Sequence, residues 1–338
     1  MINTLIVDDS PLVRNIIKDF LEEEGSFNII GEAVDGEDGV QKIVSLNPDL
    51  VTLDIEMPKK NGLEVIAEVM NINPVPIVVI TSLDTAKTAY EATLKGALEF
   101  YPKDTFTASI RPEKRQQVYE TLKRISSLKV QKKSTSIEPL APKLPEKRKI
   151  EMVVLASSTG GPKALSQFLP LIPNNFPVPL IIVQHNSSGF DRSFAQWLGT
   201  FTSLNVKIAE ENERPKAGTV YIAQTDKHLM VCGQDERQFF FRYNDDEPEN
   251  NQKPAADVLF RSAAECLKQS VVSVVLTGMG SDGALGTQKI REMGGITLAQ
   301  DECSSLIYGM PKAAAETGCV DFVLPLDSIP GELVKLTA

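Results

Sequence analysis

Several features that mark particular classes of protein are scarce or missing in this chain of 338 residues. No apolar run approaches the roughly 18 residues that suggest a membrane-spanning helix. The first residues carry no basic cluster, and the apolar segment that follows them is cut short by Asp8 and Asp9, so the sequence predicts no secretory signal. We therefore expect a cytoplasmic protein without membrane insertion.

Cysteine and histidine are also rare. The four cysteines are widely spaced and form no CxxC pair, which indicates reduced structural thiols. The two histidines have no ligand-like neighbours, which argues against a zinc site. Acidic residues outnumber basic ones, and the net charge of -10 argues against nucleic-acid binding that rests on overall positive charge.

Short apolar runs alternate with amphipathic stretches in both halves of the chain. Strands are predicted at residues 4–7, 50–53, 77–80, 152–155, 180–183, 220–222 and 271–276. Helices are predicted at residues 11–24, 36–45, 111–125, 162–169, 255–268 and 284–293. Such repetition is typical of a parallel sheet with helices on both faces, so we expect an α/β protein with two doubly wound domains.

Residues 126–149 differ in composition from both halves. Prolines, serines and lysines dominate this stretch, which offers little apolar material for a core. Its basic residues could touch an acidic partner, but a solvated linker is the favoured interpretation. We predict domains at residues 1–125 and 150–338, joined by this linker.

Acidic side chains gather at strand ends in the first predicted domain. Asp8 and Asp9 follow the strand at residues 4–7, and Asp54 follows the strand at residues 50–53. Because ligands of parallel sheets bind beyond the carboxyl ends of the strands, these three carboxylates should converge. Crowded carboxylates repel one another and Mg²⁺ prefers oxygen ligands, so the sequence predicts a magnesium site.

Two further residues extend this acidic group. Thr81 ends the strand at residues 77–80, and Lys103 follows the strand-like residues 98–101. A hydroxyl and an ammonium beside Asp54 suit a phosphoryl group carried on that aspartate. Any one of these residues alone could be a helix cap or a turn residue. All five together at strand ends favour a phosphorylation site.

The first half of the chain, roughly residues 1–125, resembles the receiver domain of two-component response regulators. The matching motifs are Val7-Asp8-Asp9-Ser10, Leu53-Asp54-Ile55-Glu56-Met57-Pro58 and Asn61-Gly62. The resemblance implies a flavodoxin-like fold in which a histidine kinase phosphorylates Asp54 and Glu56 lends its backbone carbonyl to the metal. In one departure, Pro102 precedes Lys103 here, whereas the family usually has proline directly after the lysine.

A second group of reactive side chains lies at strand ends of the second predicted domain. Ser158 stands in a small-residue turn between a strand and a helix, whose first amides favour a developing oxyanion. His185 and Asp282 follow the strands at residues 180–183 and 271–276. Together they can form a triad, in which Ser158 attacks an ester, His185 moves the proton and Asp282 orients the imidazole.

Each of these residues also has a simpler interpretation. The turn around Ser158 could cradle a phosphate, although it lacks the Gly-Lys-Ser/Thr ending of a P-loop. His185 could be structural, and His228 is a less favoured candidate for the base. If the triad is real, the backbone amides of Thr159 and Met279 are the candidates for the oxyanion hole.

Residues 150–338 resemble the catalytic domain of the CheB family, the chemotaxis protein-glutamate methylesterases. The matching stretches are Ser158-Thr159-Gly160-Gly161-Pro162, Gln184-His185, Leu276 to Ala284, Ala299-Gln300-Asp301-Glu302 and Tyr308 to Ala313. The family's nucleophile stands directly before Thr-Gly-Gly, which selects Ser158 over Ser157. Prolines commonly occupy the family's positions that Ser187 and Ser188 fill here.

The two resemblances imply a phosphorylation-activated enzyme with a Rossmann-like catalytic domain. Its substrates would be glutamyl methyl esters on methyl-accepting chemotaxis receptors, cleaved without a cofactor to glutamate and methanol, and some relatives also deamidate receptor glutamines. In the family, the unphosphorylated receiver blocks the active-site rim. The alternatives are a non-enzymatic response regulator that binds a receptor or another protein, a DNA-binding regulator and a general small-ester hydrolase. The acidic balance and the lack of a compact helix-turn-helix pattern disfavour DNA binding.

Overall fold

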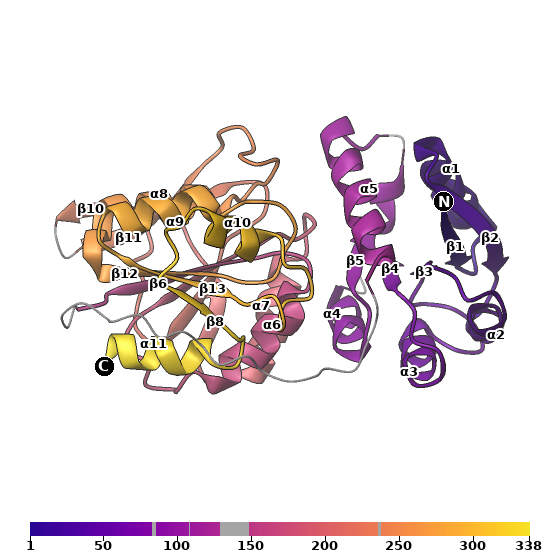
Figure 1. Ribbon diagram of the computed structural model, residues 1–338, viewed down its shortest axis with the longest axis horizontal. Coiled ribbons are helices and arrows are strands. Elements are labelled where there is room, and N and C mark those ends of the chain that lie inside the picture. The colour runs from indigo at the N-terminus through magenta and orange to yellow at the C-terminus, as the bar shows by residue number, and fades with distance from the viewer. Residues whose placement is uncertain (83–85, 108, 129–148, 236–237) are drawn as a thin grey trace. The chain divides into compact units, whose positions relative to one another are not determined.

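The computed structural model describes residues 1–82, 86–107, 109–128, 149–235 and 238–338 (Figure 1). The chain divides into two compact units, residues 1–134 and 135–338. Most of the predicted linker, residues 126–149, falls outside the described residues, so its form stays a prediction. Within the described ranges, none of the helices has both the length and the apolar character needed to cross a bilayer.

Five parallel strands form the sheet of the first unit, in the order β2-β1-β3-β4-β5. The strands are β1 (Ile2–Val7), β2 (Phe27–Ala33), β3 (Leu50–Leu53), β4 (Ile77–Thr81) and β5 (Glu99–Pro102). The helices are α1 (Pro11–Glu24), α2 (Gly36–Leu46), α3 (Gly62–Ile72), α4 (Ala86–Lys95), the short 3₁₀ helix η2 (Lys103–Phe106) and α5 (Pro112–Ser126). This is the flavodoxin-like order, which reverses direction between β1 and β3, and the predicted fold class is confirmed.

Local signals in the sequence explain these elements. Strand β3 buries all four of its residues, because a sheet covered by helices on both faces selects continuous apolar runs. Helix α1 begins at Ser10, whose hydroxyl accepts a hydrogen bond from the amide of Val13, and Pro11 occupies its first turn. It ends at Gly25, whose φ of 79° is accessible to glycine at little cost.

Seven parallel strands form the sheet of the second unit, in the order β14-β13-β12-β6-β7-β9-β8. The strands are β6 (Met152–Ser157), β7 (Leu180–Gln184), β8 (Asn205–Ile208), β9 (Thr219–Ile222), β12 (Val271–Val275), β13 (Ile296–Gln300) and β14 (Phe322–Leu324). The helices are α6 (Gly161–Phe168), η3 (Leu169–Leu171), α7 (Asp191–Leu198), η4 (Gly199–Phe201), α8 (Ala256–Leu267), η5 (Lys268–Ser270), α9 (Ala284–Glu292), α10 (Met310–Glu316) and α11 (Ile329–Thr337). The strand order reverses between β6 and β12, which is where ligands of such sheets bind.

The second unit also contains an antiparallel hairpin that the sequence pattern did not predict, formed by β10 (His228–Asp235) and β11 (Gln238–Asn244). It packs against α8: the amide of Val231 donates to Ser262 Oγ over 3.1 Å. Leu229, Val231 and Phe241 belong to the same buried cluster as Leu259 and Phe260 of the helix. The hairpin therefore belongs to the second unit through its packing on α8, which no local pattern reveals.

Candidate functional site

Three carboxylates of the first unit gather where the strand order reverses between β1 and β3. One carboxylate oxygen from each of Asp8, Asp9 and Asp54 lies within 4.8 Å of the other two. Asp8 and Asp54 are buried, whereas Asp9 is exposed. The structure therefore brings together the three acidic residues to which the sequence assigned a metal.

Lys103 provides the positive charge in this acidic group. Its Nζ lies 2.8 Å from Asp54 Oδ2 and 3.0 Å from Asp8 Oδ2. Pro102 ends β5 and pairs with Thr81, which is buried at the end of β4. The ammonium of Lys103 therefore still reaches the site, although proline precedes the lysine here. Burial raises the pKa of Asp54, and the charge of Asp8 raises it further, although Lys103 opposes both effects.

The donor set suits a hard divalent cation. All of its donors are carboxylate oxygens, and Asp8 Oδ2 is buried without a hydrogen-bond partner among the described residues, although the ammonium of Lys103 is near. Mg²⁺ would be held by Asp8, Asp9 and Asp54. The side chain of Glu56 is exposed and lies outside this trio, so a contribution from its backbone carbonyl stays a prediction.

Ser158, His185 and Asp282 follow three neighbouring strands of the second unit, β6, β7 and β12. The amide of His185 donates to the carbonyl oxygen of Ser157 over 3.0 Å. On the other side, the amide of Ser158 donates to the carbonyl oxygen of Thr277 over 3.0 Å. These bonds hold the serine loop between the loop that carries the histidine and the loop that carries the aspartate.

The imidazole of His185 pairs with the carboxylate of Asp282. Nε2 of the histidine lies 2.8 Å from Oδ2 of the aspartate, and the two side chains are only 6% and 2% exposed. Nδ1 of the imidazole is buried and has no hydrogen-bond partner in the described part of the chain. With Nε2–H directed at the carboxylate, Nδ1 keeps a lone pair that can accept a proton.

Backbone amides hold the carboxylate of Asp282. The amides of Ala256, Asp257 and Gly283 donate to it over 2.6, 3.0 and 3.0 Å. Two of these amides belong to the first turn of α8, whose own N-cap side chain makes no capping bond. Burial opposes ionisation, but the hydrogen bond from His185 and those from the amides lower the pKa of Asp282. The carboxylate is therefore charged when it orients the imidazole.

The two alternative reactive residues are committed to other contacts. Ser157 is fully buried, and its hydroxyl donates to Gln184 Oε1 over 2.6 Å. His228 accepts a hydrogen bond from the amide of Ala255 at Nδ1, and its Nε2 lies 3.1 Å from the carbonyl oxygen of Glu247. With both nitrogens engaged, His228 has no lone pair left for general-base chemistry.

Thr159 and Met279, the predicted oxyanion residues, stand on the two loops that meet at the nucleophile. The amides that precede them, those of Ser158 and Gly278, donate to backbone carbonyls over 3.0 and 3.1 Å. A Cβ atom on Gly278 would lie 2.8 Å from Cβ of Ser158, so only glycine allows this close approach. Thr159 and Met279 thus carry the next amides along each loop, and their role stays a prediction.

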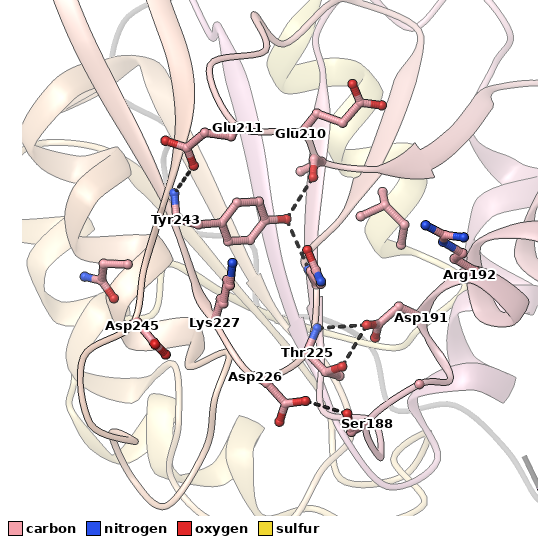
Figure 2. A pocket seen from close by; sticks show the side chains of 15 residues that line it. Ser188, Asp191, Arg192, Glu210, Glu211, Thr225, Asp226, Lys227, Tyr243 and Asp245 are labelled. Carbon is pink, nitrogen blue, oxygen red and sulfur yellow. Dashed lines mark hydrogen bonds between the residues drawn. The ribbon is translucent and has the colours of Figure 1, made fainter.

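A pocket of about 1140 Å³ lies beside the loop that follows His185, at the carboxyl ends of β8 and β9 (Figure 2). Ser188 donates a hydrogen bond to Asp226, and Asp191 accepts from the amide and the hydroxyl of Thr225 over 2.9 and 2.7 Å. These bonds tie the loop to the turn after β9. Here a side-chain hydrogen bond holds the loop at a position where the family commonly has proline.

Sequence reasoning missed three residues that organise the site. Gln184 donates through Nε2 to the carbonyl oxygens of Ser158 and His185, both over 3.0 Å, and so links the two loops. Asn250 and Asp257 lie behind Asp282. The place of Gln184 at a strand end was a usable signal, whereas nothing local marks Asn250 or Asp257.

Comparisons with known proteins show the family of both units. Residues 153–333 match the family model of the CheB methylesterase, and residues 4–111 match that of the response regulator receiver domain. A protein-glutamate methylesterase/protein-glutamine glutaminase of Thermotoga maritima is 37% identical over 342 residues, which cover 99% of this chain and 98% of the relative. A relative of the same description from Pyrococcus abyssi is 38% identical over 352 residues, covering 99% and 93%. The crystal structure of the T. maritima CheB methylesterase catalytic domain shares 41% identity with a TM-score of 0.54, covering 56% of this chain and 100% of that one.

Proposed function

The chain belongs to the CheB methylesterase family, and from this premise we propose that its second unit hydrolyses glutamyl methyl esters on methyl-accepting chemotaxis receptors. Ser158, His185 and Asp282 form the catalytic triad of this reaction. The observation that carries the proposal is the buried 2.8 Å contact between the imidazole and the carboxylate, beside the serine loop.

In the proposed reaction, Oγ of Ser158 attacks the ester carbonyl while Nδ1 of His185 takes the hydroxyl proton. Asp282 stabilises the imidazolium, and the amides of Thr159 and Met279 donate to the oxyanion. The imidazolium returns the proton to the departing methanol. Water, activated by the same nitrogen, then cleaves the acyl-enzyme and releases glutamate. A receptor glutamine reacts through the same steps with ammonia as the leaving group, which suits the glutaminase part of the relatives' names.

The receiver unit makes this activity dependent on phosphorylation. A chemotaxis histidine kinase donates a phosphoryl group to Asp54. Asp8, Asp9 and Asp54 would hold Mg²⁺, which would supply positive charge to offset that of the phosphoryl oxygens. Lys103, which now pairs with Asp54, then pairs with the phosphoryl oxygens, and Thr81 responds to them. Phosphorylation raises activity to the extent that phosphorylated Asp54 stabilises the active conformation more than the inactive one.

A matched pair of serine variants tests the hydrolytic assignment. Ser158→Ala should lower methanol release from methylated receptor membranes by about 10³-fold or more, because the nucleophile is lost. Ser157→Ala should keep most of the activity, since the buried hydroxyl of Ser157 donates to Gln184 and is not the proposed nucleophile. Retained turnover in Ser158→Ala would remove the serine from the mechanism. If the wild type binds the receptor but releases no methanol, a non-enzymatic regulator is favoured. If it hydrolyses a nitrophenyl ester and the receptor ester at equal rates, a general esterase is favoured.

An aspartate variant tests the phosphorylation control. Asp54→Ala should keep basal methanol release but lose the stimulation that a phosphodonor gives the wild type. Radiolabelled phosphodonor should label the wild type and Ser158→Ala equally and leave Asp54→Ala unlabelled. Full stimulation of Asp54→Ala would contradict control through this residue.

A further inference from the structure

A second carboxylate lies behind Asp282 in the second unit. Asp257, in the first turn of α8, is completely buried. Its own amide donates to Asp282 Oδ1 over 3.0 Å. Its Oδ1 accepts from the amide of Gly286 over 2.5 Å, and its Oδ2 accepts from Nδ2 of Asn250 over 2.8 Å. The side chain is therefore fixed at both oxygens and is remote from bulk solvent.

Asn250 bridges the two carboxylates. Its Nδ2 lies 2.8 Å from Asp257 Oδ2 and 3.3 Å from Asp282 Oδ1, so each hydrogen of one amide group serves one aspartate. The neighbouring Glu249 makes a bidentate ion pair with Arg261 of α8, with both distances at 2.5 Å. This pair anchors the loop to the helix and holds the bridging amide in place.

The two carboxylates are held in opposite ways. Burial, and then the charge of Asp282, raise the pKa of Asp257 to about 6, and Glu249 acts in the same direction. The pKa of Asp282 is lowered. Arg261 interacts electrostatically with both aspartates. A proton entering this pair is thus taken up by Asp257, while Asp282 keeps its charge for His185.

We propose that Asp257 is a positioning residue of the hydrolase: with Asn250 it fixes the Asp282 carboxylate against His185, and its charge strengthens the imidazole as a base. This inference rests on the triad proposed above. An ionised Asp257 adds a second negative charge behind the imidazolium that forms when the serine is deprotonated. Below about pH 6 that charge is lost, because Asp257 becomes protonated while Asp282 stays ionised.

Asp257→Asn tests the charge with little change of shape. In the full chain, the acid limb of the kcat/KM profile for a nitrophenyl ester should move to lower pH by about one unit, because a buried negative charge that favours the imidazolium is lost. Its kcat should fall about tenfold at neutral pH and its KM should stay unchanged, because Asp257 is completely buried. An acid limb identical to that of the wild type would overturn the electrostatic role.

Asn250→Ala removes the hydrogen bonds from Asn250 to the two aspartates without changing any charge. This variant also tests the inference if Asp257→Asn does not fold. Its kcat should fall with an unchanged KM, and an unchanged kcat would overturn the positioning role. Asp321→Asn is the matched control. That aspartate accepts hydrogen bonds from Thr297 at the opposite end of the sheet, so its loss should leave the pH profile unaltered.

A readout that needs no turnover separates this inference from the proposed function. The chain has only two histidines, so isotope-labelled imidazoles give two NMR titrations. The midpoint assigned to His185 should move to lower pH in Asp257→Asn and stay unchanged in Asp321→Asn. An unmoved midpoint in folded Asp257→Asn would refute the inference even if the enzyme is active. If the wild type lacks esterase activity but the His185 midpoint still moves to lower pH in Asp257→Asn, only the proposed function is refuted.

Discussion

Both units place a buried aspartate where the strand order of a parallel sheet reverses, yet the two carboxylates are stabilised differently. Asp54 accepts one backbone amide, that of Ile55 over 2.8 Å, and lies beside Asp8 and Lys103, and its pKa is raised. Asp282 accepts three backbone amides besides the imidazole, and its pKa is lowered. The backbone itself stabilises the charge on Asp282, whereas the charge on Asp54 depends on cations.

The largest expected effect comes from removing the backbone-held charge. Asp282→Asn should lower kcat by about 10⁴-fold, because the imidazole loses the charge that orients it. The variant should also lose about 2 kcal/mol of unfolding free energy at pH 7, since one amide group would replace a carboxylate that accepts several hydrogen bonds. Steady-state ester hydrolysis and urea unfolding would check both effects. A loss of less than tenfold in kcat would contradict the role of this carboxylate.

A cation should stabilise the first unit, where Asp54 accepts the amide of Ile55 and otherwise lies beside charged side chains, and not the second. At 100 times its dissociation constant, Mg²⁺ should add about 2.7 kcal/mol to the unfolding free energy of the first unit. The chain has one tryptophan, Trp197 in α7, so its fluorescence reports on the second unit and should show no shift. Circular dichroism should show the shift, and Asp9→Ala should abolish it. A Mg²⁺-dependent shift of the tryptophan transition would contradict the contrast.

The smallest effect should have the opposite sign to that of Asp282→Asn. The raised pKa of Asp54 means that its ionisation costs stability above the folded-state pKa, and this cost disappears below the unfolded-state value of about 4. Without Mg²⁺, Asp54→Asn should therefore be more stable than the wild type at pH 7, and the gain should fade as the pH drops towards 4. For Asp282 the sign is reversed, because its lowered pKa stabilises the fold above the unfolded-state value. Urea unfolding between pH 4 and 7 would check this. If both variants change the unfolding free energy in the same direction, the contrast between the two aspartates is wrong.

Strand ends could be located in the sequence because continuous apolar runs mark the strands of a covered parallel sheet. The rule that such strands share one carboxyl edge then grouped Asp8 with Asp54, and Ser158 with His185 and Asp282. The order of the strands was not readable, because it depends on long-range pairing that leaves no local pattern. The hairpin of β10 and β11 escaped for a related reason, since it is recognisable as part of this unit only through its packing on α8.

Other parts of the site also depend on contacts between distant segments. Asn250 and Asp257 matter because the first turn of α8 meets the loop after β12, and no spacing in the sequence reveals that meeting. Likewise, the sequence ranked Ser158 above Ser157 and His185 above His228, but the contacts that engage Ser157 and His228 elsewhere became visible only in the structure. Residue type and strand position together predicted which groups react, whereas the groups that hold them in place required coordinates.

The first turn of α8 has no cap from its own sequence and depends on Asp282 to satisfy its amides. Asp282 therefore supports both the fold and the proposed reaction, which limits the substitutions that this domain can accept during evolution. A copy that loses its hydrolytic role while keeping its shape is expected to replace the serine and retain the aspartate. Genes in which position 282 has drifted should instead encode proteins with a loosened helix, and with it a loosened hairpin.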